Sequence, residues 1–394
     1  MIKREHYIEQ IRPFYDTDLI KIITGIRRSG KSVIMQQVAK ELQDSGKTTL
    51  MLNFEDQSVL DQVVDGKGLI EYVSPKVGKE KLYVFLDEIQ NLVQWADGIR
   101  TLRLRNVSIF ITGSNSRLLA REFIKEFSGR FVSFRVRPFV FSELLAYGRE
   151  LHKDVTVTDY LVWGGFPKRL EFGDRDAQIH YLTEVENTIV YNDLISRFNI
   201  RKTDLFRRLV VFVLRNNARI FSVKSICDYI CWEHIKCSVN TVIKYLGYLK
   251  DAYVIDTVTQ YSAKTKHELA FYQKIYNADV AFNSLHCFGE RYDISHNLEN
   301  VVYNELLFRG YEVKVYNDGK HEIDFLAVKN GLQYYIQVAY TVTDEKTYDR
   351  ELAGFKTIDN ISQKILITND EVDYSTSTVK HIRLKDFLQS ENYL

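Results

Sequence analysis

Residues 25–32 read Gly-Ile-Arg-Arg-Ser-Gly-Lys-Ser and follow directly after the apolar run at residues 19–23. A glycine, four residues and then Gly-Lys-Ser, between a strand and a helix, is the spacing of a loop whose backbone N–H groups surround a chain of phosphates. From residue 33 to residue 42, apolar residues recur at helical spacing, which predicts the helix whose N-terminus favours an anion. The sequence therefore predicts an α/β fold with a parallel sheet and a nucleotide site near the start of the chain.

Eight residues of this loop are expected to contact the nucleotide, which we expect to be ATP or ADP. They are Gly25, Arg27, Arg28, Ser29, Gly30, Lys31, Ser32 and Val33. In such loops the lysine reaches the terminal phosphates and the hydroxyl after it binds a magnesium ion. Mg²⁺ is therefore the second expected cofactor, with Ser32 as one of its ligands.

A second apolar run, at residues 81–91, ends in the acidic pair Asp87 and Glu88. A buried parallel strand delivers such carboxylates to its C-terminal edge, where ligands bind in open α/β sheets. We expect Asp87 to hold the magnesium through water and Glu88 to polarise the attacking water, because phosphoryl transfer needs an oriented nucleophile. The alternative is two exposed acids at a strand end.

A third apolar run, at residues 107–111, ends in Thr-Gly-Ser-Asn-Ser. Its polar end lies at a predicted strand edge, so Asn115, with Thr112 or Ser114 as a neighbour, is expected to contact the γ-phosphate or its water. A plain turn is the alternative.

Three arginines downstream are candidates for an arginine that stabilises the transferring phosphate. They are Arg130, Arg135 and Arg137, and of these Arg130 is our first choice. Such an arginine can act within the chain or across subunits, which makes a homo-oligomer one expected partner state. Surface arginines are also common, and the sequence does not choose between the three.

Several of these segments carry a family resemblance: Gly25–Ser32, Leu86–Glu88, and residues 111–119, 128–130 and 137–144. In this order they resemble the ATPase core of the AAA-type P-loop proteins of archaea and bacteria, close to the signal-transducing STAND group. The resemblance runs from the first residues to about residue 195. It implies that the Gly-Gly-Phe-Pro stretch belongs to a helical lid, with Gly165 and Pro167 near the adenine. From the residues alone, that stretch indicates only a turn.

A local excess of positive charge marks the middle of the chain. Residues 201–250 contain ten Lys and Arg against Asp204, Asp228 and Glu233. Helical spacing at residues 223–235 and 239–252, then alternation at 253–261 that indicates a strand pair, predict a winged helix. The second helix is expected to bury Val239, Val242, Leu246 and Leu249 and to present Asn240, Thr241, Lys244 and Tyr248 outward.

Two interpretations of this segment stay open. The outward residues could enter the major groove of double-stranded DNA. Winged helices of STAND-like ATPases also serve as interdomain packing and sensors of nucleotide state. Nearby, Cys227, Cys231 and Cys237 with His234 could suggest zinc, but their spacing lacks paired C-x-x-C knuckles and favours core thiols.

The last third resembles the PD-(D/E)xK nuclease fold, and the region 200–394 resembles the uncharacterised domain that regularly follows this ATPase. By that resemblance Glu299, Asp324 and Gln337 match the metal ligands of an active nuclease. The catalytic lysine does not match, because Ala339 stands at its position. Lys320 or Lys329 could substitute, but nothing in the spacing requires it, so we expect a nuclease-like domain without activity.

These patterns predict four parts: an ATPase core at 1–140, a helical lid at 141–200, a winged helix at 201–265 and a restriction-endonuclease-like α/β domain at 266–394. The chain has 53 Lys and Arg against 52 Asp and Glu, so no global field favours nucleic acid or a membrane. The N-terminus lacks the layout of a signal peptide and no apolar run approaches the length of a membrane span, which predicts a cytoplasmic location.

Three functions are therefore carried forward. The first is an ATPase that couples its nucleotide state to the C-terminal module. The second is an ATP-regulated factor that binds or processes DNA. The third is a slow nucleotide switch that recruits a protein partner.

Overall fold

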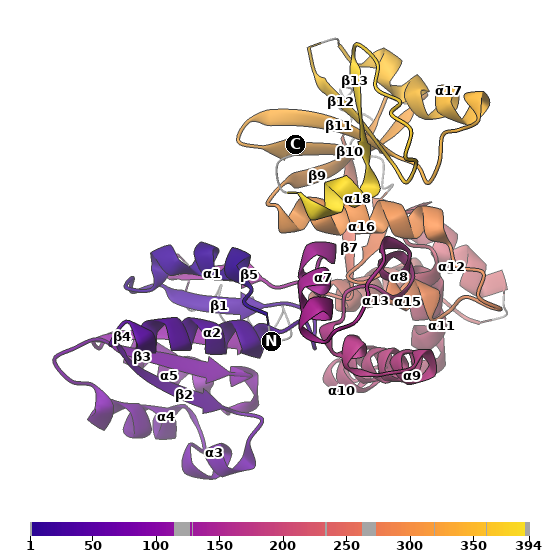
Figure 1. Cartoon of the computed structure of the whole chain (residues 1–394). Coiled ribbons are helices and arrows are strands. Elements are labelled where there is room, and N and C mark those ends of the chain that lie inside the picture. Colours follow the sequence, from indigo (N-terminus) through magenta and orange to yellow (C-terminus); the bar gives the residue numbers. More distant parts are fainter. Residues whose placement is uncertain are drawn as a thin grey trace. The chain divides into compact units, whose positions relative to one another are not determined.

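The computed structural model describes residues 2–113, 127, 129–232, 235–261, 273–318, 320–359 and 361–390 (Figure 1). These residues form two compact units. Unit 1 comprises Met1–Pro138 with Asp251–Tyr253, and unit 2 comprises Phe139–Lys250 with Val254–Leu394. No helix in the described part of the chain is long and apolar enough to cross a membrane.

Unit 1 contains a five-stranded sheet in the order β2-β3-β4-β1-β5. All its strand pairs are parallel. The strands are β1 Ile20–Thr24, β2 Thr48–Asn53, β3 Leu82–Asp87, β4 Val107–Gly113 and β5 Phe131–Arg135. Every residue of β1, β3 and β4 is buried, which is why these strands are continuous apolar runs in the sequence. The predicted parallel α/β core is confirmed.

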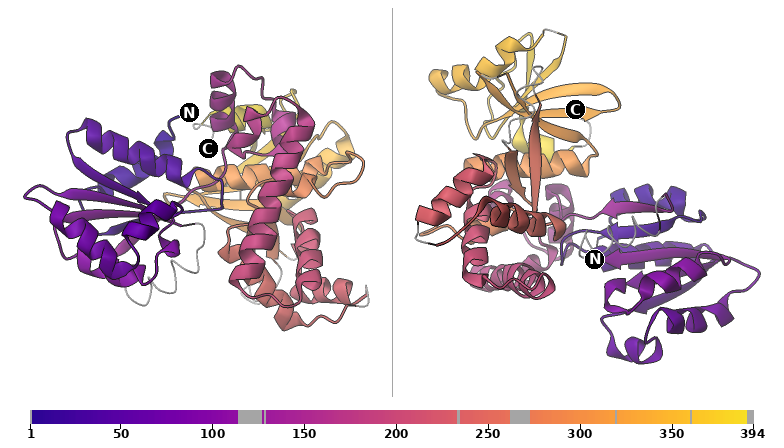
Figure 2. Two further views of the ribbon diagram at one scale, coloured as in Figure 1. Left: turned by 90° about the horizontal axis from the view of Figure 1, so that it is seen from below. Right: turned by 180° about the vertical axis from the view of Figure 1, so that it is seen from behind.

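Helices lie on both faces of this sheet (Figure 2). They are α1 Glu5–Ile11, α2 Lys31–Asp44, α3 Gln57–Gln62, α4 Gly66–Val73 and α5 Trp95–Leu102, with short 3₁₀ turns at Arg12–Phe14, Ser74–Lys76 and Ile89–Asn91. One face packs Ile20, Ile22, Val84 and Leu86 against apolar residues of α4 and α5. The helix predicted for residues 33–42 is confirmed inside α2.

Unit 2 contains an eight-stranded mixed sheet in the order β13-β12-β11-β10-β9-β7-β8-β6. Its strands are β6 Ile220–Phe221, β7 Ile255–Tyr261, β8 Gln273–Asn277, β9 Glu312–Asn317, β10 Glu322–Lys329, β11 Leu332–Val338, β12 Gln363–Thr368 and β13 Val379–Arg383. β9, β10 and β11 pair antiparallel, and β11, β12 and β13 pair parallel. β8 pairs antiparallel with both β6 and β7.

The helices of unit 2 precede or cover this sheet. They are α7 Phe141–Glu150, α8 Val157–Trp163, α9 Arg175–Glu186, α10 Leu194–Arg197, α11 Thr203–Arg215, α12 Val223–Trp232, α13 Val239–Asp251, α15 Ala281–Ser284, α16 Ile294–Phe308, α17 Glu345–Ala353 and α18 Leu384–Gln389. A π-helix at Asn187–Asp193 and 3₁₀ turns at Pro167–Glu171 and Gly354–Thr357 complete the set. α16 packs on β8, β9, β10 and β11 (Figure 1).

Three expectations for the middle segment are wrong in detail. Residues 255–261 form the single strand β7, which pairs with β8, and not a strand pair of their own. Tyr248 is buried, because its ring stacks on Phe198 at a centroid distance of 3.7 Å, whereas Val239 is 43% exposed. Asn240 and Lys244 are exposed as expected.

The expectation that the three cysteines at 227, 231 and 237 are core thiols holds for one of them. Cys227 is buried, as a core thiol should be, whereas Cys231 is exposed and Cys237 is half-buried. His234 lies outside the described residues. Among the residues that the structure describes, no group of three or more His, Cys, Asp or Glu side chains could hold a metal ion.

Candidate functional site

Glycine permits the loop between β1 and α2 to close tightly. Gly30 is the N-cap of α2 with a left-handed backbone (φ 94°), and Gly25 has φ 138°. A Cβ atom on Gly25 would lie 2.0 Å from the carbonyl oxygen of Val136, in the segment that follows β5. Any side chain at position 25 would therefore push this loop away from its neighbour, which explains the first glycine of the pattern.

Arg4 supports the loop from behind, and sequence reasoning missed it. Its side chain is 2% exposed and donates hydrogen bonds to the carbonyl oxygens of Ser29 (2.8 Å) and Arg137 (3.1 Å). Its guanidinium also lies 4.6 Å from the centre of the Tyr7 ring. Arg4 therefore joins the phosphate loop to the segment after β5. Its position far upstream of the loop gave no spacing signal that could have identified it.

Lys31 begins α2 and is nearly fully buried. Its ammonium donates to the carbonyl oxygen of Ile26 at 3.1 Å, so the side chain folds over the loop. Burial lowers the pKa of Lys31, and the nearby carboxylates of Glu88 and Asp87 act against this shift. The lysine is thus a buried cation beside two acids, and an anion bound in the loop would favour its charged form.

The other predicted loop residues differ in exposure. Arg27 lies 3.5 Å from the carboxylate of Glu55, and Arg28 is exposed with φ 69°. Ser29 is buried, and its hydroxyl oxygen has no hydrogen-bond partner within the described part of the chain. Ser32 and Val33, in the first turn of α2, are half-buried.

Thr112, at the end of β4, holds the acidic pair in place. Its hydroxyl donates to a carboxylate oxygen of Asp87 and accepts from the backbone N–H of Glu88 at 2.9 Å. Glu88 itself has a left-handed backbone (φ 48°), and its carboxylate accepts a hydrogen bond from Gln90. Thr112 is fully buried, and in this structure its hydroxyl acts on the acids.

The strand order brings these groups to one edge of the sheet. β4 lies between β1 and β3, and all three strands are parallel. The loop after β1, Thr112 at the end of β4 and the acids at the end of β3 therefore share the carboxyl edge, where open α/β sheets bind their ligands.

Of the other predicted catalytic residues, only Arg130 is described by the structure, and it is not brought to this edge. Asn115 and Ser114 lie outside the described residues. Arg130 is exposed and precedes β5, and its carbonyl oxygen accepts from the N–H of Ile20 at the start of β1. Arg130 thus lies at the amino edge of the sheet, opposite the loop, and is therefore not close to Lys31 of the same chain. Arg135 ends β5 at the carboxyl edge, and Arg137 follows it and is buried.

The Gly-Gly-Phe-Pro stretch is fixed inside unit 2. A Cβ atom on Gly164 would lie 1.6 Å from a carboxylate oxygen of Asp279, and one on Gly165 would lie 1.9 Å from the carbonyl oxygen of Phe139. Asp279 accepts from the N–H of Gly165 at 2.7 Å, and the fully buried Arg169 donates to the carbonyl oxygen of Gly164. Packing within unit 2 therefore accounts for both glycines, and Pro167 is half-buried at the start of the next turn.

Two of the three nuclease-like positions, Glu299 and Asp324, come together in unit 2 around an unexpected cation. Lys274, from β8, lies 2.9 Å from Glu299, 3.0 Å from Asp324 and 2.7 Å from Glu322. Its side chain is 5% exposed. Burial alone would lower the pKa of Lys274, but the three carboxylates outweigh burial and raise it well above its ordinary value.

Sequence reasoning missed Lys274 as the cation of this cluster. Lys320 is exposed and Lys329 lies over the Tyr311 ring, so neither of the lysines considered from the sequence supplies it. Gln337 does not present a free oxygen, since its carbonyl accepts from the N–H of Asp324 and its amide donates to Glu351.

Comparison with known proteins gives three matches along the chain. Residues 17–145 match an AAA domain, residues 155–286 a domain of unknown function (DUF8612) and residues 295–387 another domain of unknown function (DUF4143). Among solved structures, the chain is similar to a Walker-type ATPase of Pyrococcus abyssi, at 17% identity and a TM-score of 0.48, over 72% of this chain and 95% of that one.

Two curated relatives span almost the whole protein. An uncharacterized protein of Methanocaldococcus jannaschii is 29% identical over 89% of this chain and 82% of its own length. An uncharacterized protein of Haemophilus influenzae is 33% identical over 93% of each chain. This full-length similarity shows that the chain belongs to the same family as the Haemophilus influenzae relative, with an AAA domain at residues 17–145.

Proposed function

We propose that unit 1 binds ATP with Mg²⁺ and hydrolyses it. The observation that carries this proposal is the meeting, at one edge of a parallel sheet, of a buried lysine at a helix N-terminus and a buried aspartate fixed by Thr112. The loop around Lys31 supplies backbone N–H groups and a helix N-terminus to an anion.

The oxygen groups at this edge fit a magnesium ion. The Ser32 hydroxyl at the start of α2 and the Asp87 carboxylate at the end of β3 are the hard oxygen ligands that Mg²⁺ prefers. A bound ion would neutralise charge on the phosphates. Lys31 would bind the terminal phosphates, replacing its hydrogen bond to the carbonyl oxygen of Ile26.

Glu88 is the residue that we propose to orient the attacking water. It follows the buried Asp87 directly, and the bond between its N–H and Thr112 fixes its backbone. The carboxylate is half-buried and held by Gln90, so it is accessible and restrained at the same time. Positioning and charge neutralisation, and not covalent chemistry, supply most of the catalysis in this class of reaction.

Two substitutions test the proposal in the full chain. Lys31→Ala should remove ATP binding measured by calorimetry, because the buried cation on the phosphates is lost. Glu88→Gln should still bind ATP but lose turnover in a phosphate-release assay. Glu55→Gln is the matched control, since Glu55 is an acid near the loop that lies at Arg27. Normal turnover by Glu88→Gln would refute the role of Glu88.

We also propose that unit 2 joins a winged helix to a nuclease-like module that does not cut DNA. The order α11, β6, α12, α13, β7, β8, with β8 paired to both other strands, supports the winged helix. The run α16, β9, β10, β11, α17, β12 supports the nuclease-like fold. Lys274 supports inactivity, because one ammonium already engages all three carboxylates of the cluster.

The nucleotide state of unit 1 would then be relayed to this module. A cleavage assay on plasmid DNA with Mg²⁺ tests the inactive part of the proposal. We expect intact DNA, and Mg²⁺-dependent cleavage that is lost in Asp324→Asn would overturn it.

A further inference from the structure

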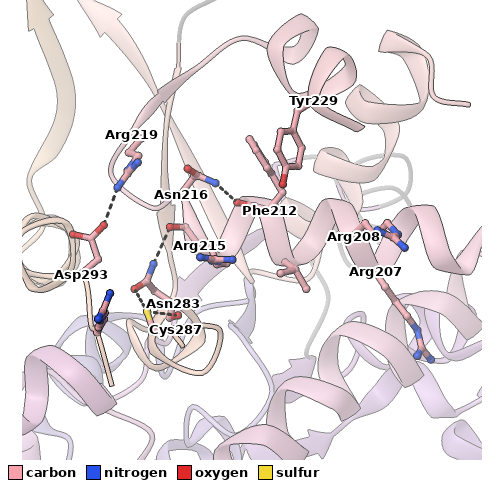
Figure 3. Close-up of a pocket in the computed structure, with 12 residues that line it drawn as sticks. Arg207, Arg208, Phe212, Arg215, Asn216, Arg219, Tyr229, Asn283, Cys287 and Asp293 are labelled. Carbon is pink, nitrogen blue, oxygen red and sulfur yellow. Dashed lines mark hydrogen bonds and ion pairs between the residues drawn. The ribbon is translucent and has the colours of Figure 1, made fainter. Parts of the chain in front are cut away.

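Unit 2 contains a cavity of about 660 Å³ that none of the predicted sites uses (Figure 3). It lies between α11, α12 and the segment at residues 283–293. Its volume is within the range of ordinary ligand pockets.

Positive charge dominates the lining of this cavity. Five arginines line it, namely Arg207, Arg208, Arg215, Arg219 and Arg291, against the single acid Asp293. Arg219 pairs with Asp293 at 3.0 Å, and Arg208 pairs with Asp204 at 3.3 Å. The side chains of Arg215 and Arg291 are exposed and make no ion pair within the described part of the chain.

One wall of the cavity is aromatic. Phe212 and Tyr229 lie with ring centres 4.7 Å apart, and Tyr229 is 44% exposed (Figure 3). Asn216 also lines the cavity, and its amide donates to the carbonyl oxygen of Phe212. The cavity therefore combines guanidinium groups with an accessible π face.

We propose that this cavity binds a segment of single-stranded nucleic acid. Arginines would contact successive phosphates, and a base would stack on Tyr229. A positively charged groove beside aromatic side chains is the arrangement by which proteins hold single strands without reading their sequence. Guanidinium groups suit phosphates because their planar donors bind two oxygens at once.

The charge distribution favours a nucleic-acid strand, with several phosphates, over a single isolated phosphate as the ligand. Three arginines on α11, with Arg219 between α11 and β6 and Arg291 in the segment at residues 283–293, exceed what a single phosphate would neutralise. The whole protein is close to neutral, and four of the ten Lys and Arg of residues 201–250 line this cavity. The outward face of α13 is a weaker candidate, because Tyr248 is buried there and Lys244 is the exposed cation beside Asn240.

Fluorescence anisotropy with a labelled oligothymidine tests the proposal on the full chain without ATP. We expect binding that weakens with salt, because each phosphate contact on a single strand contributes a slope of about −0.7 in log K against log salt. The double variant Arg215→Gln with Arg291→Gln should reduce that slope by about 1.4, which is two contacts. Both side chains are exposed, so folding should persist, and circular dichroism checks it.

A second pair of variants tests the stacking. Tyr229→Ala should weaken binding by about 5- to 160-fold, as loss of one base–aromatic stack does, whereas Tyr229→Phe should retain it. Arg149→Gln with Arg350→Gln is the matched control, since both are exposed arginines of unit 2 outside the cavity.

Three results would overturn the proposal. One is no binding of the oligothymidine at low salt. Another is binding that is unchanged in the double variant Arg215→Gln with Arg291→Gln but weakened in the control variant Arg149→Gln with Arg350→Gln. The third is binding that is weakened by Lys244→Gln and by none of the cavity variants, which would assign the nucleic acid to α13. Because none of these variants touches unit 1, failure here is distinct from failure of the ATPase proposal.

Discussion

Substitution of Lys274 by methionine would leave the buried carboxylates of Glu299 and Asp324 and the half-buried carboxylate of Glu322 without their shared cation. The ammonium lies between 2.7 and 3.0 Å from Glu299, Glu322 and Asp324. At an effective dielectric constant of about 20, each such pair has a Coulomb energy of roughly 6 kcal/mol, which desolvation and repulsion between the acids largely offset. Removing one partner of a buried ion pair costs about 3–5 kcal/mol in net stability.

For a unit of this size, 1 kcal/mol corresponds to about 2–4 °C in Tm. We therefore expect Lys274→Met to lower the Tm of unit 2 by about 6–20 °C at neutral pH, measured by calorimetry. Lys364→Met is the matched control, because this lysine is also buried in the sheet but its ammonium donates to the carbonyl oxygen of Ile358. That control should cost about 1 kcal/mol, the value of one hydrogen bond.

The loss should depend on pH in a known direction. Burial and the neighbouring Asp324 raise the pKa of Glu299 to about 7, and Lys274 acts against this shift. Without Lys274 the pKa of Glu299 rises further, so Glu299 takes up its proton at a higher pH than in the wild type, and the repulsion diminishes as the pH falls. The destabilisation should thus be largest above pH 7 and smaller at pH 5. A Tm within about 2 °C of the wild type, or a loss equal at both pH values, would refute this reasoning.

Two further predictions concern single hydrogen-bonding groups. Thr112→Val keeps the shape of the side chain but removes the hydroxyl that holds Asp87 and Glu88. ATP should still bind, while kcat falls by about a hundredfold because the acids are no longer fixed. An unchanged kcat in a phosphate-release assay would contradict this. Asp279→Asn removes a carboxyl whose pKa burial raises to about 6. A carboxyl whose pKa is raised in the folded state contributes its full stability at pH values below its unfolded pKa, near 3.8. This contribution is lost as the pH rises through the folded pKa of about 6. The gap in unfolding free energy between wild type and Asp279→Asn should therefore narrow between pH 4 and pH 6 in urea titrations, and a constant gap would contradict it.

The phosphate loop and the acidic pair could be recognised from sequence because each is a contiguous stretch beside a buried strand. Local spacing sets the geometry of Gly25–Ser32, and continuous apolar runs mark strands that are buried on both faces. Asn115 stays a prediction, since it lies outside the described residues.

Helical periodicity was less decisive for α13. It identified the helix but not which of its sides would be covered, and Tyr248 is buried because Phe198, from a distant segment, stacks on it. A distant partner also explains why residues 255–261 form a single strand and not a strand pair. Their partner is β8, which lies outside the stretch of sequence whose alternation was considered.

The sequence by itself determined a parallel α/β core and the glycine-rich loop after its first strand, because the residues that form such a loop are neighbours along the chain. Only the tertiary structure decided what surrounds the acids, the glycines and the arginines. Lys274 is 25 residues from Glu299 and 50 from Asp324, and Arg4 is 25 residues from Ser29, yet each pair shares a hydrogen bond. Charge pairs of this kind depend on distance in space, and no periodicity along the chain encodes that distance.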